Sequence, residues 1–193
     1  MCWRRDLNVI STDTPIDNIF PALVSGCTMS LTHLNLARNP FSSSKKVKEV
    51  PAAFKKFFAA TKVLTYVNVS HCKLPPDALK DLLLGLAANE FTKNVELNLS
   101  NNQLGAQGAV VLENCLEGVR CVTRLDLSEN SIDAEMAGVM AGVARNRSVL
   151  SLNVSRNMHG TKAKNMAAVM DSIVHMIQVG SRLNLLGSSF LFT

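Results

Sequence analysis

Histidines and cysteines are the side chains in this sequence that could perform covalent or metal chemistry. They are His33, His71, His159, His175, Cys2, Cys27, Cys72, Cys115 and Cys121. A serine hydrolase would pair a histidine with an activated serine, often in a GxSxG turn, and the sequence contains no such turn. A zinc site needs ligands at short spacing, and Cys115 and Cys121 have no histidine at that spacing. We therefore predict no catalytic residue, no metal ligand and no cofactor.

Composition and charge narrow the class of protein further. The 193 residues are 47% hydrophobic but only 5% aromatic, which favours repeated layers of aliphatic side chains. The net charge of +5 permits acidic partners, but no basic motif with interleaved aromatic residues indicates nucleic-acid binding. Gly105-Ala-Gln-Gly108 resembles the GxxG loop of an RNA-binding module, although a glycine between a turn and a helix explains it better. We expect protein partners, with no nucleic acid and no small-molecule substrate.

The sequence shows no pattern of secretion or membrane insertion. Its five cysteines are odd in number and form no CxxC pair, which fits a reducing compartment. The first residues are not followed by an apolar run, and no apolar stretch reaches transmembrane length. We expect a cytoplasmic protein.

One segment recurs along most of the chain. Residues 31–41, 64–74, 94–104, 122–132 and 149–159 fit the template LxxLxLxxNxL. Apolar and polar residues alternate within it, as in Leu97 and Leu99 beside Glu96 and Asn98, which predicts a short strand with one buried face. The asparagine position of the template is held by Asn39, Cys72, Asn102, Asn130 and Asn157, at spacings of 33, 30, 28 and 27 residues.

The asparagine after each strand has a structural role in this interpretation. Its amide can satisfy backbone groups of the turn and of the neighbouring repeat, which would otherwise be buried without partners. We predict that Asn39, Asn102, Asn130 and Asn157 form a structural ladder. Cys72 takes part in it as a weaker substitute, because a thiol is a poor donor.

Each turn is followed by apolar residues at helical spacing. Units of about 28 residues that contain a full helix indicate a horseshoe-shaped solenoid. The fold class is therefore α/β, with parallel strands on the concave face and helices on the convex face. Pro51 and Pro76 stand where helices begin. The apolar residues expected on the buried face of each successive helix are Val50, Phe54, Phe57 and Phe58; Leu79, Leu82, Leu83 and Leu86; Leu112, Cys115, Leu116 and Val119; Met136, Val139, Met140 and Val143; and Met166, Val169, Met170, Ile173 and Ile177.

The two ends are less regular than the middle. We expect a partial N-terminal repeat over residues 1–29, with a strand at 7–9 and a helix from about 15 to 24. About five leucine-rich repeats follow over 30–178, and an irregular tail over 179–193, in which Leu183-Asn-Leu185 imitates a strand. Solenoids need polar caps, and we find none at either end. We therefore expect an excerpt of a longer array, marginally stable or self-associating when isolated.

Three segments carry a resemblance to a known family. Residues 30–41, 50–58 and 82–87 resemble the CARMIL family of actin-capping-protein regulators, within the ribonuclease-inhibitor-like class of leucine-rich repeats. The resemblance covers roughly residues 5–178. It implies partners in the actin regulatory machinery and a role in actin filament organisation and cell migration, at the lamellipodium beneath the plasma membrane. The family's basic capping-protein motif has no match after residue 178, so the resemblance carries over only the repeat scaffold.

Side chains on the outer face of successive strands are the candidate contacts for a partner. Tyrosine and arginine are common interface anchors, and the predicted partner-binding set is His33, Tyr66, Glu96, Arg124 and Asp126. The neighbouring Asn and Ser columns are interpreted as keeping the sheet soluble. A basic patch of Lys45, Lys46, Lys48, Lys55 and Lys56 could contact a membrane surface, at about 1 kcal/mol per lysine, or simply be a solvated face.

The sequence thus favours a non-catalytic protein-binding scaffold and leaves alternatives open. One is a small-GTPase activator, which would place an arginine on a strand-to-helix loop, and Arg38 and Arg156 are its candidates. The others are an innate-immune or a tropomodulin-type repeat domain.

Overall fold

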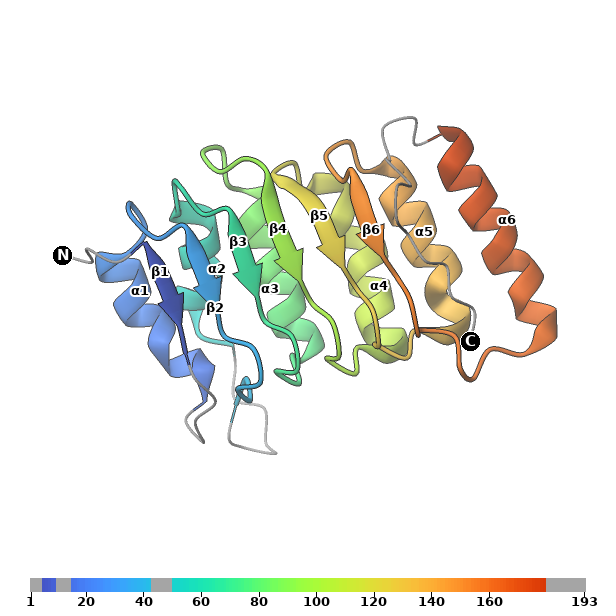
Figure 1. The fold of residues 1–193 in the computed structure, drawn as a ribbon, viewed down its shortest axis with the longest axis horizontal. Helices are drawn as coiled ribbons and strands as arrows, with labels where there is room; N and C mark the ends of the chain where they lie inside the picture. The colour runs from blue at the N-terminus through green and yellow to red at the C-terminus, as the bar shows by residue number, and fades with distance from the viewer. Residues whose placement is uncertain (1–4, 10–14, 43–49, 180–193) are drawn as a thin grey trace.

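In the computed structural model, described residues 5–9, 15–42 and 50–179 alternate between short strands and helices (Figure 1). The strands are β1 (Asp6–Asn8), β2 (His33–Asn35), β3 (Tyr66–Asn68), β4 (Val95–Asn98), β5 (Val122–Asp126) and β6 (Ser151–Asn153). The helices are α1 (Phe20–Gly26), α2 (Ala52–Ala60), α3 (Pro76–Ala87), α4 (Gly105–Cys115), α5 (Met136–Arg145) and α6 (Ala163–Val179). Three 3₁₀ turns are η1 (Ile16–Ile19), η2 (Leu116–Gly118) and η3 (Asp133–Glu135).

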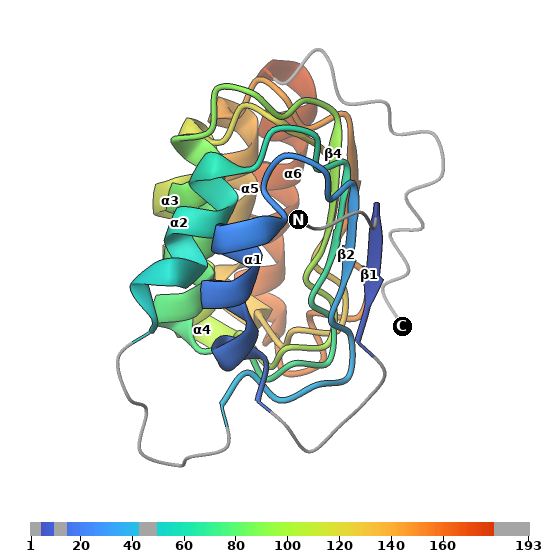
Figure 2. The same cartoon turned by 90° about the vertical axis from the view of Figure 1, so that its left-hand side faces the viewer.

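The six strands form one parallel sheet in chain order, β1-β2-β3-β4-β5-β6. Seen along the stack, the sheet is one layer and the helices are the other (Figure 2). Leu34, Val67, Leu97 and Leu125 stand at the same level in neighbouring strands and point to the helices, where they are buried. This arrangement confirms the predicted α/β leucine-rich repeat fold.

The core between the layers is aliphatic except at the N-terminal end. There Phe20 from α1 packs against Phe54 from α2 with ring centroids 4.5 Å apart in a T-shaped geometry. Phe57 and Phe58 complete the cluster, and all four rings are fully buried. Gly85 brings α3 close to α2, because a Cβ at this position would lie 2.7 Å from the Lys55 carbonyl oxygen.

The template asparagines connect successive repeats through buried hydrogen bonds. The Asn102 Nδ2 group donates to the carbonyl oxygens of Leu99 in its own turn, at 2.8 Å, and of Val69 in the preceding repeat, at 2.9 Å. Its Oδ1 accepts the backbone N–H groups of Cys72 and Leu74 at 3.0 and 3.1 Å. Each such side chain thus holds two neighbouring turns together. The equivalent bonds of Asn39, Asn130 and Asn157 continue the ladder.

Cys72 reproduces only half of these contacts. Its thiol donates to the Leu36 carbonyl oxygen at 3.1 Å and to the Ser70 carbonyl oxygen at 3.3 Å. Sulfur is a weaker acceptor than an amide oxygen, so the thiol is a poor substitute in the acceptor role that the Asn102 side chain plays for Cys72 itself.

Two details of the helices differ from the sequence-based prediction. The N-terminal helix begins as η1 and continues as α1 to Gly26, beyond the expected end near Val24. In α6 Met170 and Ile177 are about 40% exposed, whereas Val169 and Met176 are buried. The apolar residues of α6 cover a part of the helix surface wide enough to contact two neighbouring elements. Among the described elements, α5 and η3 are the ones that pack closely against it. Residues 183–185 lie outside the described part of the chain.

Candidate interaction face

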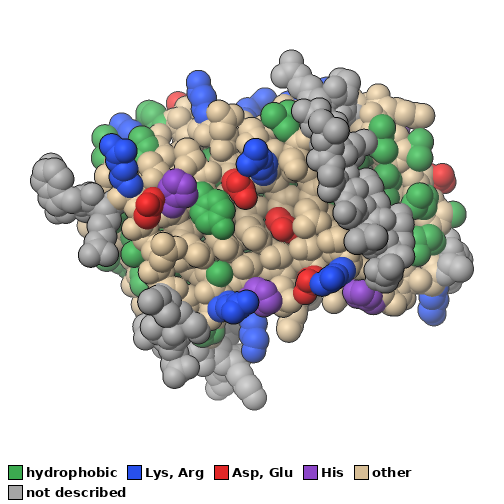
Figure 3. Space-filling view, viewed as in Figure 1, with side chains coloured by type: hydrophobic (Ala, Val, Ile, Leu, Met, Phe, Trp, Pro, Cys, Tyr) green, Lys and Arg blue, Asp and Glu red, His purple; other side chains and the backbone are tan. Residues whose placement is uncertain are grey.

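The outer side chains of the sheet fall into rows because the strands pair in parallel. At the first outward position Asp6 stands opposite His33, His33 opposite Tyr66, and Tyr66 opposite Glu96. The row continues to Arg124 and Ser151, after a register shift between Val95 and Glu96. We call these six residues the first row. Figure 3 shows acidic, basic and histidine side chains gathered around a hydrophobic one on this face.

The N-terminal half of the first row is an oriented pair of rings. The His33 Nδ1 atom lies 2.9 Å from an Asp6 carboxylate oxygen and 3.0 Å from the Thr32 hydroxyl. The His33 and Tyr66 ring centroids are 5.8 Å apart. The Tyr66 hydroxyl accepts a hydrogen bond from the Asn68 amide at 3.2 Å. Both rings are therefore oriented by polar neighbours while their edges stay accessible.

The C-terminal half of the first row is an ion pair. An Arg124 guanidinium nitrogen lies 3.4 Å from a Glu96 carboxylate oxygen, and the two side chains are 69% and 46% exposed. Exposed pairs of this kind contribute at most about 1 kcal/mol to stability. Their charges therefore remain available to a partner, and the pair mainly orients the two side chains.

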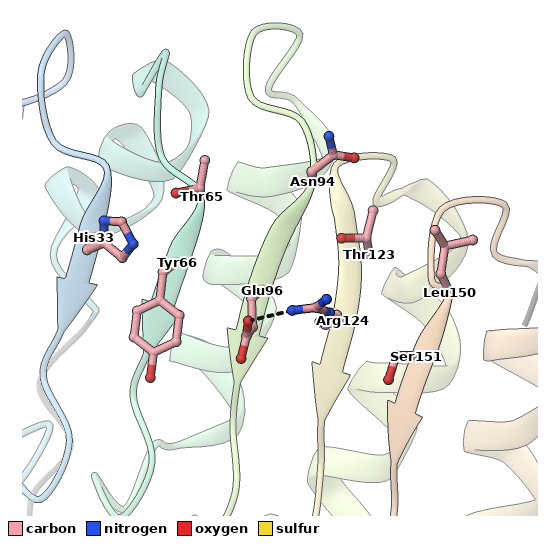
Figure 4. Close-up of a pocket in the computed structure, with 9 residues that line it drawn as sticks. All are labelled: His33, Thr65, Tyr66, Asn94, Glu96, Thr123, Arg124, Leu150 and Ser151. Atoms are coloured by element: carbon pink, nitrogen blue, oxygen red, sulfur yellow. Dashed lines mark hydrogen bonds and ion pairs between the residues drawn. The ribbon is translucent and has the colours of Figure 1, made fainter. Parts of the chain in front are cut away.

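Five of the six first-row residues, all except Asp6, line a groove of about 700 Å³ on the outer face of the sheet (Figure 4). Its other lining residues are Thr65, Asn94, Thr123 and Leu150. The groove offers an aromatic pair, one carboxylate, one guanidinium and several hydroxyl and amide groups. Such groups can donate and accept hydrogen bonds and can pack against an apolar or aromatic side chain. The structure thus brings His33, Tyr66, Glu96 and Arg124 together, while what they bind stays a prediction.

Asp126, the fifth predicted contact, is the next outward-facing residue of β5 after Arg124. It lines a smaller neighbouring hollow together with Glu96 and Arg124. Its Oδ1 accepts the backbone N–H and the hydroxyl of Ser128, at 2.9 and 2.7 Å. Asn98 and Asn153 make the same turn with the serine two residues on. This column therefore shapes the strand ends, and Asp126 offers a partner mainly its second carboxylate oxygen.

Two buried asparagines, Asn89 and Asn146, lie at the edge of the sheet where helices lead into strands. The sequence analysis did not identify their role. The Asn89 amide donates to the carbonyl oxygens of Phe58 and Thr61, both at 2.7 Å. Asn146 donates to Leu116 and Val119 at 2.6 and 2.8 Å. Each one joins the end of its own helix to the loop of the preceding repeat. The signal in the sequence is an asparagine directly after an apolar helix, with a Ser or Thr two or three residues later.

A second row of polar side chains lies in the turns that come after the strands, at residues whose backbone is in the left-handed region. It contains Arg38, His71, Asn101, Glu129 and Arg156, with φ between 54° and 62°. The Glu129 carboxylate accepts from the Asn101 amide at 2.9 Å and pairs with Arg156 at 3.0 Å. These two contacts, the Asn101 hydrogen bond first, lower the pKa of Glu129. Arg156, a candidate of the GTPase alternative, is therefore in an ion pair within its own row.

The predicted basic patch stays a prediction. Lys55 and Lys56 are exposed on α2, in the helix layer, and Lys45, Lys46 and Lys48 lie outside the described residues. Within the described ranges, no three His, Cys, Asp or Glu side chains gather closely enough to hold a metal ion. No helix in that part of the chain has the length and apolarity needed to cross a membrane.

Comparisons with known proteins agree with the leucine-rich repeat fold. A family model described as "CARMIL family, LRR domain" matches residues 4–189. The human protein "Capping protein, Arp2/3 and myosin-I linker protein 3" is 39% identical over 89% of this chain, and "Protein CARMIL" of Dictyostelium discoideum is 29% identical over 90%. The chain spans only 12% and 16% of the length of these relatives.

Solved structures show the same fold. The leucine-rich repeat protein LegL7 of Legionella pneumophila superposes with a TM-score of 0.54 at 27% identity, covering 82% of this chain and 49% of that one. A leiomodin-1 structure containing its actin-binding site 2 also gives 0.54, at 14% identity, and covers 88% and 94%. At that identity the leiomodin likeness concerns the fold alone.

Proposed function

Because this chain belongs to the CARMIL family and matches the family's leucine-rich repeat domain, we propose that it is a non-catalytic platform that binds proteins of the actin regulatory machinery. The observation that carries the proposal is the first row, which places an aromatic pair and an ion pair side by side in one open groove. A partner that covers Tyr66 and Arg124 would bury the two residue types most common among binding hot spots.

The names of the relatives suggest which partners to test. The human relative is named a linker of capping protein, Arp2/3 and myosin-I. We infer that at least one of these three binds the first row here. The proposal extends to regulation of filament capping, to cell migration and to a cytoplasmic location at the leading edge. This chain spans 12% of the human relative, and in this proposal it supplies the platform for a longer protein.

Direct binding of the purified 193-residue chain to capping protein, Arp2/3 complex and a myosin-I tests the proposal. The groove variant combines Tyr66→Ala, Glu96→Gln and Arg124→Gln. The matched control combines Val110→Ala, Asp81→Asn and Lys80→Gln, all on the helix layer, and changes charge by the same amount.

We expect wild type and control to bind at least one of these proteins with Kd values within about twofold of each other. The groove variant should bind about thirtyfold more weakly, since loss of a hot spot costs about 2 kcal/mol. Equal binding by the groove variant, or no binding by wild type to any of the three, would refute the proposal.

The small-GTPase alternative stays a prediction from the sequence and has its own test. In a single-turnover assay with a panel of small GTPases, we expect no acceleration by this chain. An acceleration that is lost in Arg38→Ala or Arg156→Ala would replace the platform proposal. The family match leaves the innate-immune and tropomodulin-type alternatives without support.

A further inference from the structure

The loops that lead from each helix into the next strand form one edge of the sheet, which we call the N-terminal rim. Three successive loops of this rim expose large apolar side chains, with Met29 at 64%, Val63 at 39% and Phe91 at 53% exposure. A single exposed apolar side chain is ordinary. Three on adjacent loops form a cluster that calls for a ligand.

The three loops are physically joined. The Lys62 backbone N–H donates to the Thr28 carbonyl oxygen at 2.8 Å, which connects the loops that carry Met29 and Val63. The Lys62 ammonium nitrogen lies 4.6 Å from the centre of the Phe91 ring. The loops that carry Met29, Val63 and Phe91 are therefore joined in sequence along the rim, and the Phe91 ring lies beside a cation.

The same rim is basic. Lys62, Lys93, Arg120 and Arg147 are exposed on its loops, against Glu90 in the described loop segments 27–32, 61–65, 88–94, 119–121 and 146–150 and Glu117 in η2, which pairs with Arg145. Basic and hydrophobic side chains both occur along the upper edge of the molecule, with an acidic one among them (Figure 3). The rim thus combines protruding apolar groups with a net positive charge.

The backbone beneath Phe91 is fixed. The buried Asn89 side chain donates to Thr61 in the preceding loop and accepts the Phe91 backbone N–H at 2.8 Å. Asn146 holds the Arg147 loop in the same way, through the Ser148 backbone N–H at 2.8 Å. Because the loops are held before any ligand arrives, little ordering entropy is lost on binding.

We propose that the N-terminal rim docks on an anionic lipid bilayer. Met29, Val63 and Phe91 enter the headgroup region, and Lys62, Lys93, Arg120 and Arg147 bind lipid phosphates. Aromatic side chains favour that interface, and cations close to an anionic surface add to the attraction. The side chains project from several loops along one edge of the sheet, so a lipid surface can contact more than one loop at once.

This surface differs from the basic patch of Lys45, Lys46, Lys48, Lys55 and Lys56 considered from the sequence. It also shares no residue with the first row. The inference therefore does not depend on the proposed function, and either one can fail without the other.

Co-sedimentation of the full 193-residue chain with lipid vesicles tests the inference. One set is phosphatidylcholine alone, and the other contains phosphatidylcholine and phosphatidylserine at about 7:3. We expect binding only to the serine-containing set, about tenfold weaker for Phe91→Ser and about fivefold weaker for each of Lys93→Gln and Arg120→Gln. The matched controls are Val110→Ser, which is 52% exposed on α4, and Lys80→Gln on α3, and both should bind as wild type does.

A second readout reports insertion directly. In a Trp3→Phe background, Phe91→Trp places the single tryptophan on the rim, and its emission should shift to the blue with serine-containing vesicles. Circular dichroism melts establish that each variant is folded, and Met29→Ser serves in place of Phe91→Ser if that variant is not. The inference is overturned if vesicles do not bind, if rim and control variants bind alike, or if the emission stays unchanged. Rim-dependent capture of an acidic protein without vesicle binding would equally overturn it, in favour of a protein ligand.

Discussion

Glu96 on β4 and Arg124 on β5 face each other across the outer side of the sheet, with carboxylate oxygen and guanidinium nitrogen 3.4 Å apart. They are 28 residues apart in the sequence and meet because their strands are paired neighbours. The pair is exposed, so its contribution to folding and its contribution to binding can be separated by mutation.

A double-mutant cycle with Glu96→Gln and Arg124→Gln should give a coupling free energy of unfolding below about 0.5 kcal/mol, because water and salt screen exposed charges. Urea denaturation of the four proteins measures it. A coupling above about 2 kcal/mol would mean that the pair is a structural element of the sheet.

Asn102→Ala should be among the most destabilising polar substitutions in the chain. It leaves the Val69 carbonyl oxygen and the N–H groups of Cys72 and Leu74 without their buried partner, and leaves the Leu99 carbonyl oxygen with Asn130 alone. We expect a loss of about 3 kcal/mol in the free energy of unfolding, against about 1 kcal/mol for Cys72→Ala. Equal losses in denaturant melts would show that the acceptor half of the ladder contributes little.

Gly85→Ala should destabilise the contact between α2 and α3. The new Cβ would lie 2.7 Å from the Lys55 carbonyl oxygen and 2.9 Å from the Phe58 Cβ, so the helices must move apart. We expect a loss of roughly 1–3 kcal/mol. Gly118→Ala is the control, since its nearest contact is the Ala87 Cβ at 3.5 Å. A Tm for Gly85→Ala equal to that of wild type would contradict the prediction.

Glu129 should make a small contribution to stability that depends on pH. Its carboxyl pKa is lowered from 4.5 by Asn101 first and Arg156 second. The stabilisation is therefore present above pH 4.5 and is lost as the pH falls through the lowered pKa. An NMR titration should show the Glu129 pKa rising towards 4.5 in Asn101→Gly, which keeps the left-handed backbone without strain. An unchanged pKa in that variant would rule out the Asn101 hydrogen bond as the cause.

Cys72 should resist alkylation in the folded chain. Burial raises the pKa of its thiol to about 11, so little reactive thiolate exists at pH 8. We expect iodoacetamide, followed by mass spectrometry, to modify half-buried Cys27 well before Cys72, with Cys72 reacting once denaturant opens the ladder. Rapid modification of Cys72 without denaturant would contradict its burial.

The sequence predicted the repeats, the strand positions and the direction of most core side chains, because the spacing of Leu and Asn follows directly from the strand-and-turn geometry. It also placed His33, Tyr66, Glu96 and Arg124 at one outward template position. It did not show that His33 pairs with Asp6, because Asp6 lies on β1, outside the five template segments.

Other features depend on the neighbours that each residue meets in three dimensions. Asn89 and Asn146 resemble ordinary loop asparagines until the preceding repeat places carbonyl oxygens beside them. The exposure of Met170 and Ile177 follows from what lies beside α6, which a helical pattern alone does not specify. Periodicity identifies a face of a helix, but not how many neighbours cover it.

The parallel strands give the molecule a fixed polarity across its width. All six strands run from the N-terminal rim towards the left-handed turns. A lipid surface against that rim would orient every strand roughly perpendicular to the membrane. The first-row residues of all strands would then lie at about the same distance from the headgroups. A protein arriving at the first row would then meet it from the side, travelling along the membrane plane.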